Sequence, residues 1–157
     1  DAGCGTGLCG PVLRPYAARL VGVDLSARML TRAKATGCYD SLRRDELVAA
    51  LVAERGSYDL IVAADVLIYF GELGDLLAAA AGALRLDGLL AVTLERHDGG
   101  APLLQPSGRY AHSECYLRET ADSAGLEVLE LRRCELRTEA GTPVPGLVAI
   151  ARPAAAA

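Results

Sequence analysis

Short continuous apolar runs alternate along this chain with longer segments of helical character. The runs over residues 20–24, 58–65 and 89–95 predict parallel strands that are buried on both faces. Helices are predicted over residues 26–36 and 74–86, between those runs. Alternation of strand and helix in this way predicts an α/β sandwich with a mostly parallel sheet.

Weaker patterns predict the remaining elements. Residues 38–44 have no clear period, and the long segment over residues 96–112 is expected to be a loop. Six strands are expected in total. The other expected elements are a helix over 8–14, a strand ending near 45–47, a helix over 48–55, a helix from Ser113 to about 124, and an antiparallel hairpin of strands over 126–137 and 143–152.

The chain opens with Asp-Ala-Gly-Cys-Gly-Thr-Gly, which places three glycines at alternate positions. Glycine lets the backbone approach a ligand where a Cβ would clash, and a helix start next to it presents unpaired amides. Asp24 ends the following strand roughly 20 residues later, where an acid can accept both hydrogen bonds from a ribose diol. The spacing therefore predicts a nucleotide-type site; the alternative is a tight turn and a solvated acid.

Composition narrows the class of protein. With 157 residues, 52% hydrophobic and 23% charged, the chain has enough apolar material for one domain with its own core. A net charge of -4 argues against a nucleic-acid partner, which needs a clustered basic face. Five cysteines without a CxxC pair predict neither a metal site nor a disulfide framework, so reduced thiols in the cytoplasm are expected. We find no apolar run of membrane length and no signal peptide.

Several stretches together resemble class I S-adenosylmethionine-dependent methyltransferases. Residues 1–7 and Val-Gly-Val-Asp-Leu-Ser at 21–26 resemble the first two motifs of that family, and residues 58–65 resemble its fourth-strand motif. The turn at 84–90 is also similar, although Leu86 and Asp87 stand where the family has Pro and Gly. A narrower resemblance, to bacterial predicted methyltransferases often joined to tetratricopeptide repeats, rests on residues 7–11, 63–70 and 104–113.

The resemblance implies a Rossmann-like three-layer sandwich, S-adenosyl-L-methionine as cofactor, and methyl transfer by in-line displacement. It also implies a methyltransferase domain over residues 1–152 whose first strand is missing from this sequence, followed by a disordered tail over 153–157. Leu25 and Met29 would border the adenine, although a methionine on an apolar helix face is more often core. Glu46, favoured over Asp45, would contact the adenine amino group. The full implied cofactor set is Asp1, Gly3, Gly5, Gly7, Asp24, Leu25, Met29, Glu46, Leu47, Ala64 and Asp65.

The methyl acceptor is expected beside residues 96–112, because the carboxyl ends of the strands face the ligand in open α/β sheets. His112 is the candidate general base. Arg109 and Tyr110 could orient the acceptor, since the forked donors of arginine suit a carboxylate or a phosphate, and Tyr69 could contact it. The alternative is that His112 caps the next helix, Tyr110 packs and Arg109 is solvated. The acceptor itself, a small molecule or a protein side chain, is left open.

Two other functions fit part of the pattern. Residues 5–10 match the GxGxxG of NAD(P)-binding Rossmann oxidoreductases, with Asp24 at a suitable distance. A non-catalytic domain could also keep a cofactor site of this kind. Asp1, Gly3 and the terminal hairpin favour the methyltransferase over the oxidoreductase, and the chain has no Tyr-x-x-x-Lys pair.

Overall fold

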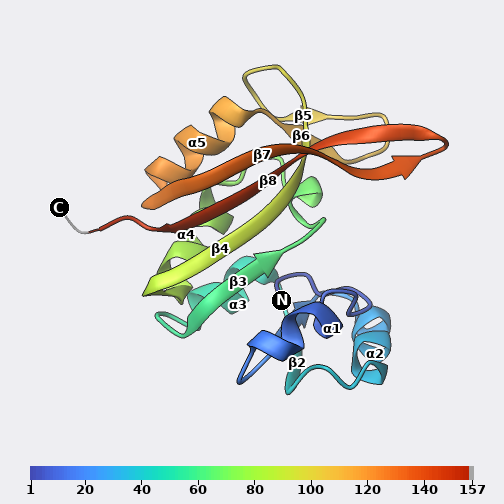
Figure 1. Ribbon diagram of the computed structural model, residues 1–157, viewed down its shortest axis with the longest axis vertical. Helices are drawn as coiled ribbons and strands as arrows, with labels where there is room; N and C mark the ends of the chain where they lie inside the picture. Colours follow the sequence, from blue (N-terminus) through green and yellow to red (C-terminus); the bar gives the residue numbers. More distant parts are fainter. Residues whose placement is uncertain (156–157) are drawn as a thin grey trace.

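Strand β4 (Leu84–Arg96) is the centre of the larger sheet, because three other strands pair with it. The strands β3 (Tyr58–Ala63) and β6 (Tyr110–His112) run parallel to β4, and β8 (Thr142–Pro153) runs antiparallel. β5 (Leu103–Leu104) pairs with β6, and β7 (Leu126–Glu139) pairs with β8. The computed structural model describes residues 1–155, and Figure 1 shows β3, β4, β8 and β7 fanning out as one twisted sheet.

A second, two-stranded sheet consists of β1 (Val21–Asp24) and β2 (Ser41–Arg44), which pair in parallel. Residues 1–3 connect it to the larger sheet. The amide of Val23 donates to the carbonyl of Asp1 at 3.0 Å, and the amide of Ala2 donates to the carbonyl of Val62 at 2.7 Å. The first residues of the chain thus lie between β1 and β3 and align the two sheets.

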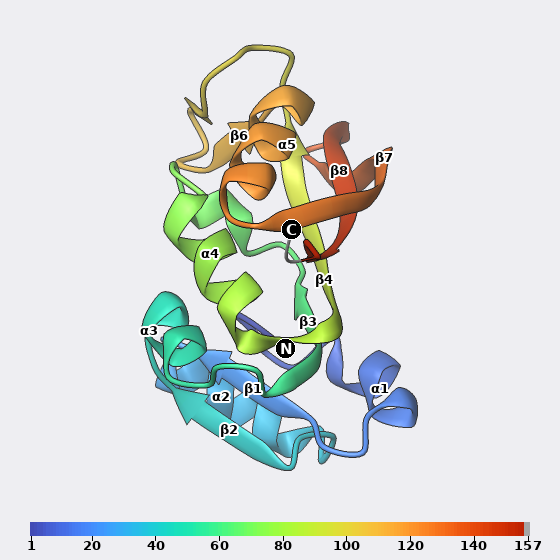
Figure 2. The ribbon, with the colours of Figure 1, turned by 90° about the vertical axis from the view of Figure 1, so that its left-hand side faces the viewer.

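Helices cover both faces of this arrangement. Figure 2 shows α4 on one side of β3 and β4, and α1 on the other. The side chains with the least exposed surface gather where α4 and α5 meet the sheet, and burial of each contributes about 1.5–3 kcal/mol; they include Leu67, Leu73, Leu77, Leu94, Leu117 and Leu147. No helix within residues 1–155 is long and apolar enough to cross a membrane. The helical elements are α1 (Gly10–Leu13), η1 (Arg14–Tyr16), α2 (Ala27–Ala35), α3 (Leu47–Val52), η2 (Leu67–Tyr69), α4 (Gly74–Ala83) and α5 (Glu114–Ser123).

The predicted α/β sandwich with a C-terminal antiparallel hairpin is confirmed. The larger sheet is mixed instead of mostly parallel, because among the described residues two of its strand pairings are parallel and three are antiparallel. The predicted loop over 96–112 contains β5 and β6, so residues 1–155 hold eight strands instead of the six expected. Strands of two and three residues are too short to show a hydrophobic period.

The two ends of the prediction also differ in detail. The first helix begins at Gly10 and gives way to the 3-10 turn η1, where Pro15 has no amide to continue an α-helix. At the other end, Pro153 is the last residue of β8, and the amide of Ala154 donates to the carbonyl of Gly125 at 2.8 Å. Of the tail predicted over 153–157, residues 156–157 lie outside the described part.

Candidate active site

The glycine loop over residues 1–7 turns back on the end of β1. Its three glycines have φ values of 72°, 52° and 87°, which side-chain-bearing residues rarely adopt. The amides of Gly3 and Cys4 both donate to the carbonyl of Val23, at 2.8 and 2.9 Å. The loop is therefore held by backbone bonds to the strand that also carries Asp24.

Gly3 and Gly5 face different surroundings. A Cβ at Gly3 would lie 2.5 Å from Cγ2 of Val66, so Gly3 is needed for packing against the segment after β3. A Cβ at Gly5 would have no protein atom within 4 Å. The backbone at Gly5 is thus open to approach from outside, as a ligand-binding loop requires.

Asp24 lies directly beside this open backbone. Its Oδ2 accepts a hydrogen bond from the Gly5 amide at 2.9 Å, and its Oδ1 accepts one from the Ser26 amide at 2.8 Å. A carboxylate has about four acceptor positions, so both oxygens keep capacity for a further donor. The predicted proximity of the glycine loop and the strand-end acid is present in the structure.

Tyr39 packs against the glycine loop and contributes to the site, although no sequence motif indicated this residue. Its hydroxyl donates to Oδ2 of Asp1 at 2.5 Å, and burial raises the pKa of this phenol to about 12. Ring atoms of Tyr39 would lie 3.1, 2.9 and 3.0 Å from a Cβ at Gly7, Gly10 and Gly22. The one signal in the sequence was Gly22, since glycine inside a strand often marks a close approach of another group.

Leu25 and Met29 border the same opening. Their exposed fractions are 66% and 41%, so neither belongs to the core. The amide of Met29 donates to the hydroxyl of Ser26, which caps α2 as predicted. Two exposed apolar side chains next to Asp24 are available to a flat, partly apolar ligand.

The two acids after β2 both accept local hydrogen bonds. Both carboxylate oxygens of Glu46 accept hydrogen bonds from the first turn of α3, from the amides of Val48 at 3.0 Å and Ala49 at 2.8 Å. Leu47 is buried in the core. Asp45 lies one residue earlier, where its carboxylate is 3.7 Å from Arg43 and partly exposed. Oδ1 of Asp45 also accepts a hydrogen bond, from the Glu46 amide at 2.9 Å. Both acids therefore keep acceptor positions for a further donor.

Asp65 follows β3 and Ala64 with a φ of 58°, an uncommon value for a residue other than glycine. Its amide donates to Oγ1 of Thr93 at 2.8 Å, which fixes the turn against β4. Its carboxylate forms an ion pair of 2.8 Å with Arg137 of the hairpin. Because Val66 packs on Gly3, this turn lies beside the glycine loop.

The predicted acceptor-side residues separate into exposed and packed groups. Tyr69 has 69% of its surface exposed and is accessible to a ligand. Tyr110 packs with its ring 3.0 Å from where a Cβ of Gly71 would be. Arg109 is neither solvated nor free, because it pairs with the carboxylate of Glu139.

His112 is placed otherwise than a general base requires. Its side chain has no exposed surface, Nε2 lies 3.0 Å from the carbonyl of Gly71, and the ring stacks on Tyr116 at 5.6 Å between centroids. Burial lowers the pKa of the imidazole and keeps it neutral. A neutral ring at this carbonyl donates through Nε2, which leaves the buried Nδ1 without a partner among the described residues. The ring is thus enclosed in this conformation, and the role of His112 as general base stays a prediction.

A cavity lies elsewhere in the molecule. A space of about 570 Å³ opens between the amino-terminal halves of β1 and β3. Leu20 and Val21 line one side of this space, and Tyr58 and Leu60 line the other. Leu60 is 44% exposed although it belongs to a strand predicted to be buried on both faces. Asp1 also lines this space, but most of its lining comes from the amino-terminal ends of β1 and β3 and the segments before them, so we do not assign it to the active site.

The fold is that of an α/β domain, in which the glycine loop and Asp24 lie together at the carboxyl end of β1. A family profile described as a methyltransferase domain matches residues 1–90 of this chain, more than half of its length. The chain therefore belongs to the methyltransferase domain family, and the class of enzyme is a methyltransferase. The oxidoreductase alternative is not favoured.

Solved structures confirm the fold. A methyltransferase from Methanosarcina mazei, described as S-adenosylmethionine-dependent, has a TM-score of 0.77 at 17% identity, covering 97% of this chain and 90% of its own. The 1,6-didemethyltoxoflavin-N1-methyltransferase of Burkholderia thailandensis, solved with 1,6-didemethyltoxoflavin and S-adenosylhomocysteine bound, has a TM-score of 0.79 at 20% identity, covering 98% and 69%. The [4+2]-cyclase SpnF has a TM-score of 0.77 at 18% identity, covering 97% and 73%. No curated protein matches the sequence significantly.

Proposed function

We propose that this protein transfers a methyl group from S-adenosylmethionine to a small-molecule acceptor by in-line displacement. The observation that carries the proposal is the pairing of Asp24 with the Gly5 amide beneath a backbone that is open to approach. An acid held there can accept hydrogen bonds from both hydroxyls of a ribose. S-adenosylmethionine and its product S-adenosylhomocysteine both contain this ribose. The cofactor supplies a methyl group on a positively charged sulfur.

The surrounding residues fit the rest of such a cofactor. Leu25 and Met29 offer exposed apolar surface next to Asp24, suited to the faces of an adenine. We assign the contact with the adenine amino group to Glu46, with Asp45 as the alternative, because each Glu46 oxygen accepts one bond from α3 and keeps a further acceptor position. Ala64 and Asp65 border the end of the site that is nearest to β4.

The chain's contribution to the reaction is mainly positional. A displacement at a methyl carbon needs the nucleophile, methyl group and leaving sulfur in line, and enforcing that geometry accounts for much of the acceleration. Tyr69 is exposed next to the turn at Asp65 and is our candidate to contact the acceptor, with Arg109 to orient it. We propose that Tyr110 and His112 fix the position of Gly71. The ring of Tyr110 packs against its Cα, and Nε2 of His112 binds its carbonyl.

Two finer parts of the proposal rest on the sequence. The tetratricopeptide-associated methyltransferases are the subgroup to which we assign the chain, on residues 63–70 and 104–113. We place the protein in the cytoplasm because its cysteines show no disulfide spacing.

The test is methyl transfer from S-adenosylmethionine labelled with a trideuterated methyl group. The protein is incubated with the cofactor and a bacterial metabolite extract, and mass spectrometry identifies products that gain three deuterium atoms. Formation of S-adenosylhomocysteine together with a labelled product supports the proposal. Tight binding of S-adenosylhomocysteine without any turnover would instead indicate a non-catalytic domain or a different reaction, such as the one named for the cyclase of the same fold.

A further inference from the structure

Two arginines and three carboxylates from distant parts of the chain form one cluster, and the carboxylate of Asp65 is one of the three. Arg137, near the end of β7, binds Oδ1 of Asp65 at 2.8 Å through Nη1 and Oε1 of Glu139 at 2.6 Å through Nε. Its Nη2 pairs with Glu95 at the end of β4. Arg109 pairs with the same Glu139 oxygen and lies 3.9 Å from Oε1 of Glu95. The group carries two positive and three negative charges.

The carboxylates of Glu95 and Glu139 are held very differently. The Glu95 side chain is 5% exposed and also accepts a hydrogen bond from Gln105, so it is a fixed counter-ion. The Glu139 side chain is 42% exposed and stands at the end of β7, next to Ala140 and Gly141 with φ values of 47° and 82°. The Glu139 carboxylate can therefore move away from the arginines into solvent, whereas the buried Glu95 carboxylate cannot.

Both guanidinium groups converge on a single oxygen of Glu139. Arginine presents planar, forked donors that match a carboxylate, and two of them around one carboxylate form a strong recognition site for that group. Hydrogen bonds from Arg137 and Arg109 lower the pKa of Glu139, which keeps it ionised. The hairpin residue therefore occupies a position in which a free carboxylate would also be bound.

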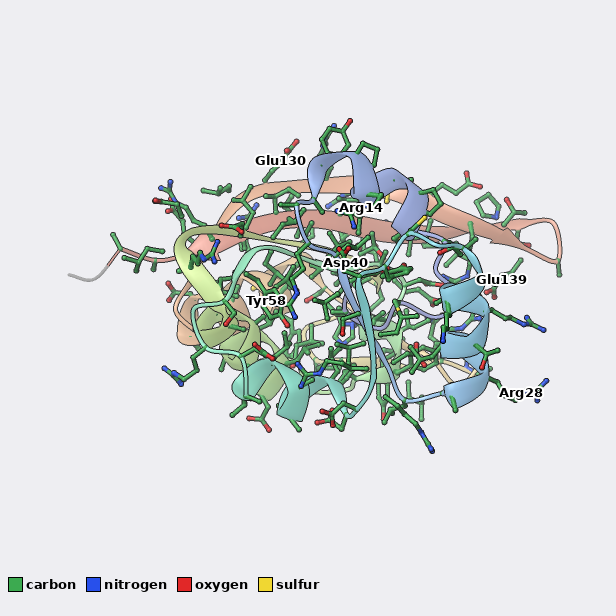
Figure 3. The ribbon with its side chains drawn as sticks, turned by 90° about the horizontal axis from the view of Figure 1, so that it is seen from below. Arg14, Arg28, Asp40, Tyr58, Glu130 and Glu139 are labelled. Atoms are coloured by element: carbon green, nitrogen blue, oxygen red, sulfur yellow. The ribbon has the colours of Figure 1, made fainter. Side chains whose placement is uncertain are left out.

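This cluster lies next to the site of methyl transfer. Asp65 precedes Val66, which packs against Gly3 of the cofactor loop. In Figure 1 the β7–β8 hairpin and α2 both lie on the right-hand side, the hairpin above and α2 below, and Figure 3 labels Glu139 on that side. An acceptor anchored between Arg109 and Arg137 would thus be close to Asp65 and Tyr69.

We propose that Arg109 and Arg137 bind a carboxylate on the methyl acceptor, and that the Glu139 carboxylate occupies this position between the two arginines until the acceptor displaces it. This rests on the proposed function and specifies its substrate class. Exchanging Glu139 for another monocarboxylate leaves the net charge of the cluster at -1. A phosphate dianion would make it -2, next to the fixed charges of Glu95 and Asp65, and is disfavoured for that reason.

The test uses protein saturated with S-adenosylhomocysteine and measures binding of sodium benzoate by NMR titration of the arginine Nε–Hε signals. Benzamide serves as the neutral analogue and inorganic phosphate as the dianion. Glu139→Gln removes the competing charge and two partly exposed ion pairs, so it should tighten benzoate binding about fivefold to thirtyfold. Arg109→Gln should weaken it by about tenfold or more; Arg109 is the safer arginine to change, because Arg137 still neutralises Glu95.

A matched control lies on the same strand. Glu130 pairs with Arg132 at 2.6 Å and lies nearer the start of β7, well away from Glu139 in Figure 3, so Glu130→Gln should leave benzoate affinity unchanged. Equal binding of benzoate and benzamide, no gain from Glu139→Gln, or tighter binding of phosphate than of benzoate would each overturn the proposal. Failure to bind S-adenosylhomocysteine in the first step would contradict the proposed function instead, so the two failures are distinguishable.

Discussion

Replacing Gly5 with alanine separates the ligand-binding role of the loop from its folding role. Gly5 has a φ of 52°, and a Cβ there would meet no protein atom within 4 Å. The substitution therefore costs only the left-handed backbone strain of a non-glycine residue, about 1–2 kcal/mol of unfolding free energy. If the cofactor lies over this backbone, the new methyl group also enters the space of the ligand.

Gly37, at the end of α2, provides the control. Its φ is 68°, a Cβ there would also meet nothing within 4 Å, and it is not in the glycine loop. We expect Gly5→Ala and Gly37→Ala to lower the free energy of unfolding by similar amounts in urea titrations. Only Gly5→Ala should weaken S-adenosylhomocysteine binding, by about fivefold to 150-fold, the equivalent of an overpacking cost of roughly 1–3 kcal/mol. Wild-type affinity in Gly5→Ala would refute the placement of the cofactor.

Three further predictions follow from the neighbours of the site. His112→Gln keeps a donor for the Gly71 carbonyl but cannot titrate. Because the pKa of His112 is lowered in the folded state, the unfolding free energy of the wild type should fall as the pH drops below about 6.5, by at most ~1.4 kcal/mol per pH unit. Urea titrations at pH 7.5 and 5.5 should show a smaller loss of unfolding free energy in the variant. Tyr39→Phe removes the 2.5 Å bond to Asp1 and should cost roughly 1 kcal/mol of stability, checked in urea with Tyr16→Phe, which is 87% exposed, as the control. Four β-branched residues added ahead of Asp1 should enter the 570 Å³ cavity, pair with β1 and β3, and raise the Tm by roughly 5 °C. Four Gly/Ser residues added at the same place should leave the Tm unchanged, and equal Tm values for the two extensions would contradict this prediction.

Local patterns predicted the elements that carry the cofactor site. Residues 58–63 form β3 because an apolar run without Gly or Pro suits a parallel strand. Gly5 and Asp24 meet because the loop, α1 and β1 follow one another over a short stretch of chain, and the amides of Gly3 and Cys4 bind the carbonyl of Val23.

The acceptor side could not be predicted in the same way. Asp65 and Arg137 are 72 residues apart, and their contact depends on where the hairpin lies in the folded molecule. The burial of His112 depends on β6, a three-residue strand without a visible period. The role of Glu46 as the cap of α3 depends on where that helix begins, which the sequence does not indicate.

Calorimetry with S-adenosylhomocysteine and with NAD tests the central claim most directly. We expect S-adenosylhomocysteine to bind and NAD not to bind, and Asp24→Asn to weaken the former by about fivefold to 150-fold, because a ribose hydroxyl bond to a charged acceptor worth roughly 1–3 kcal/mol is lost. Asparagine keeps one acceptor, for either the Gly5 or the Ser26 amide, and loses the other bond. Thermal unfolding of the variant measures that loss and checks that the loop is intact. Tight binding of NAD without binding of S-adenosylhomocysteine would contradict the account.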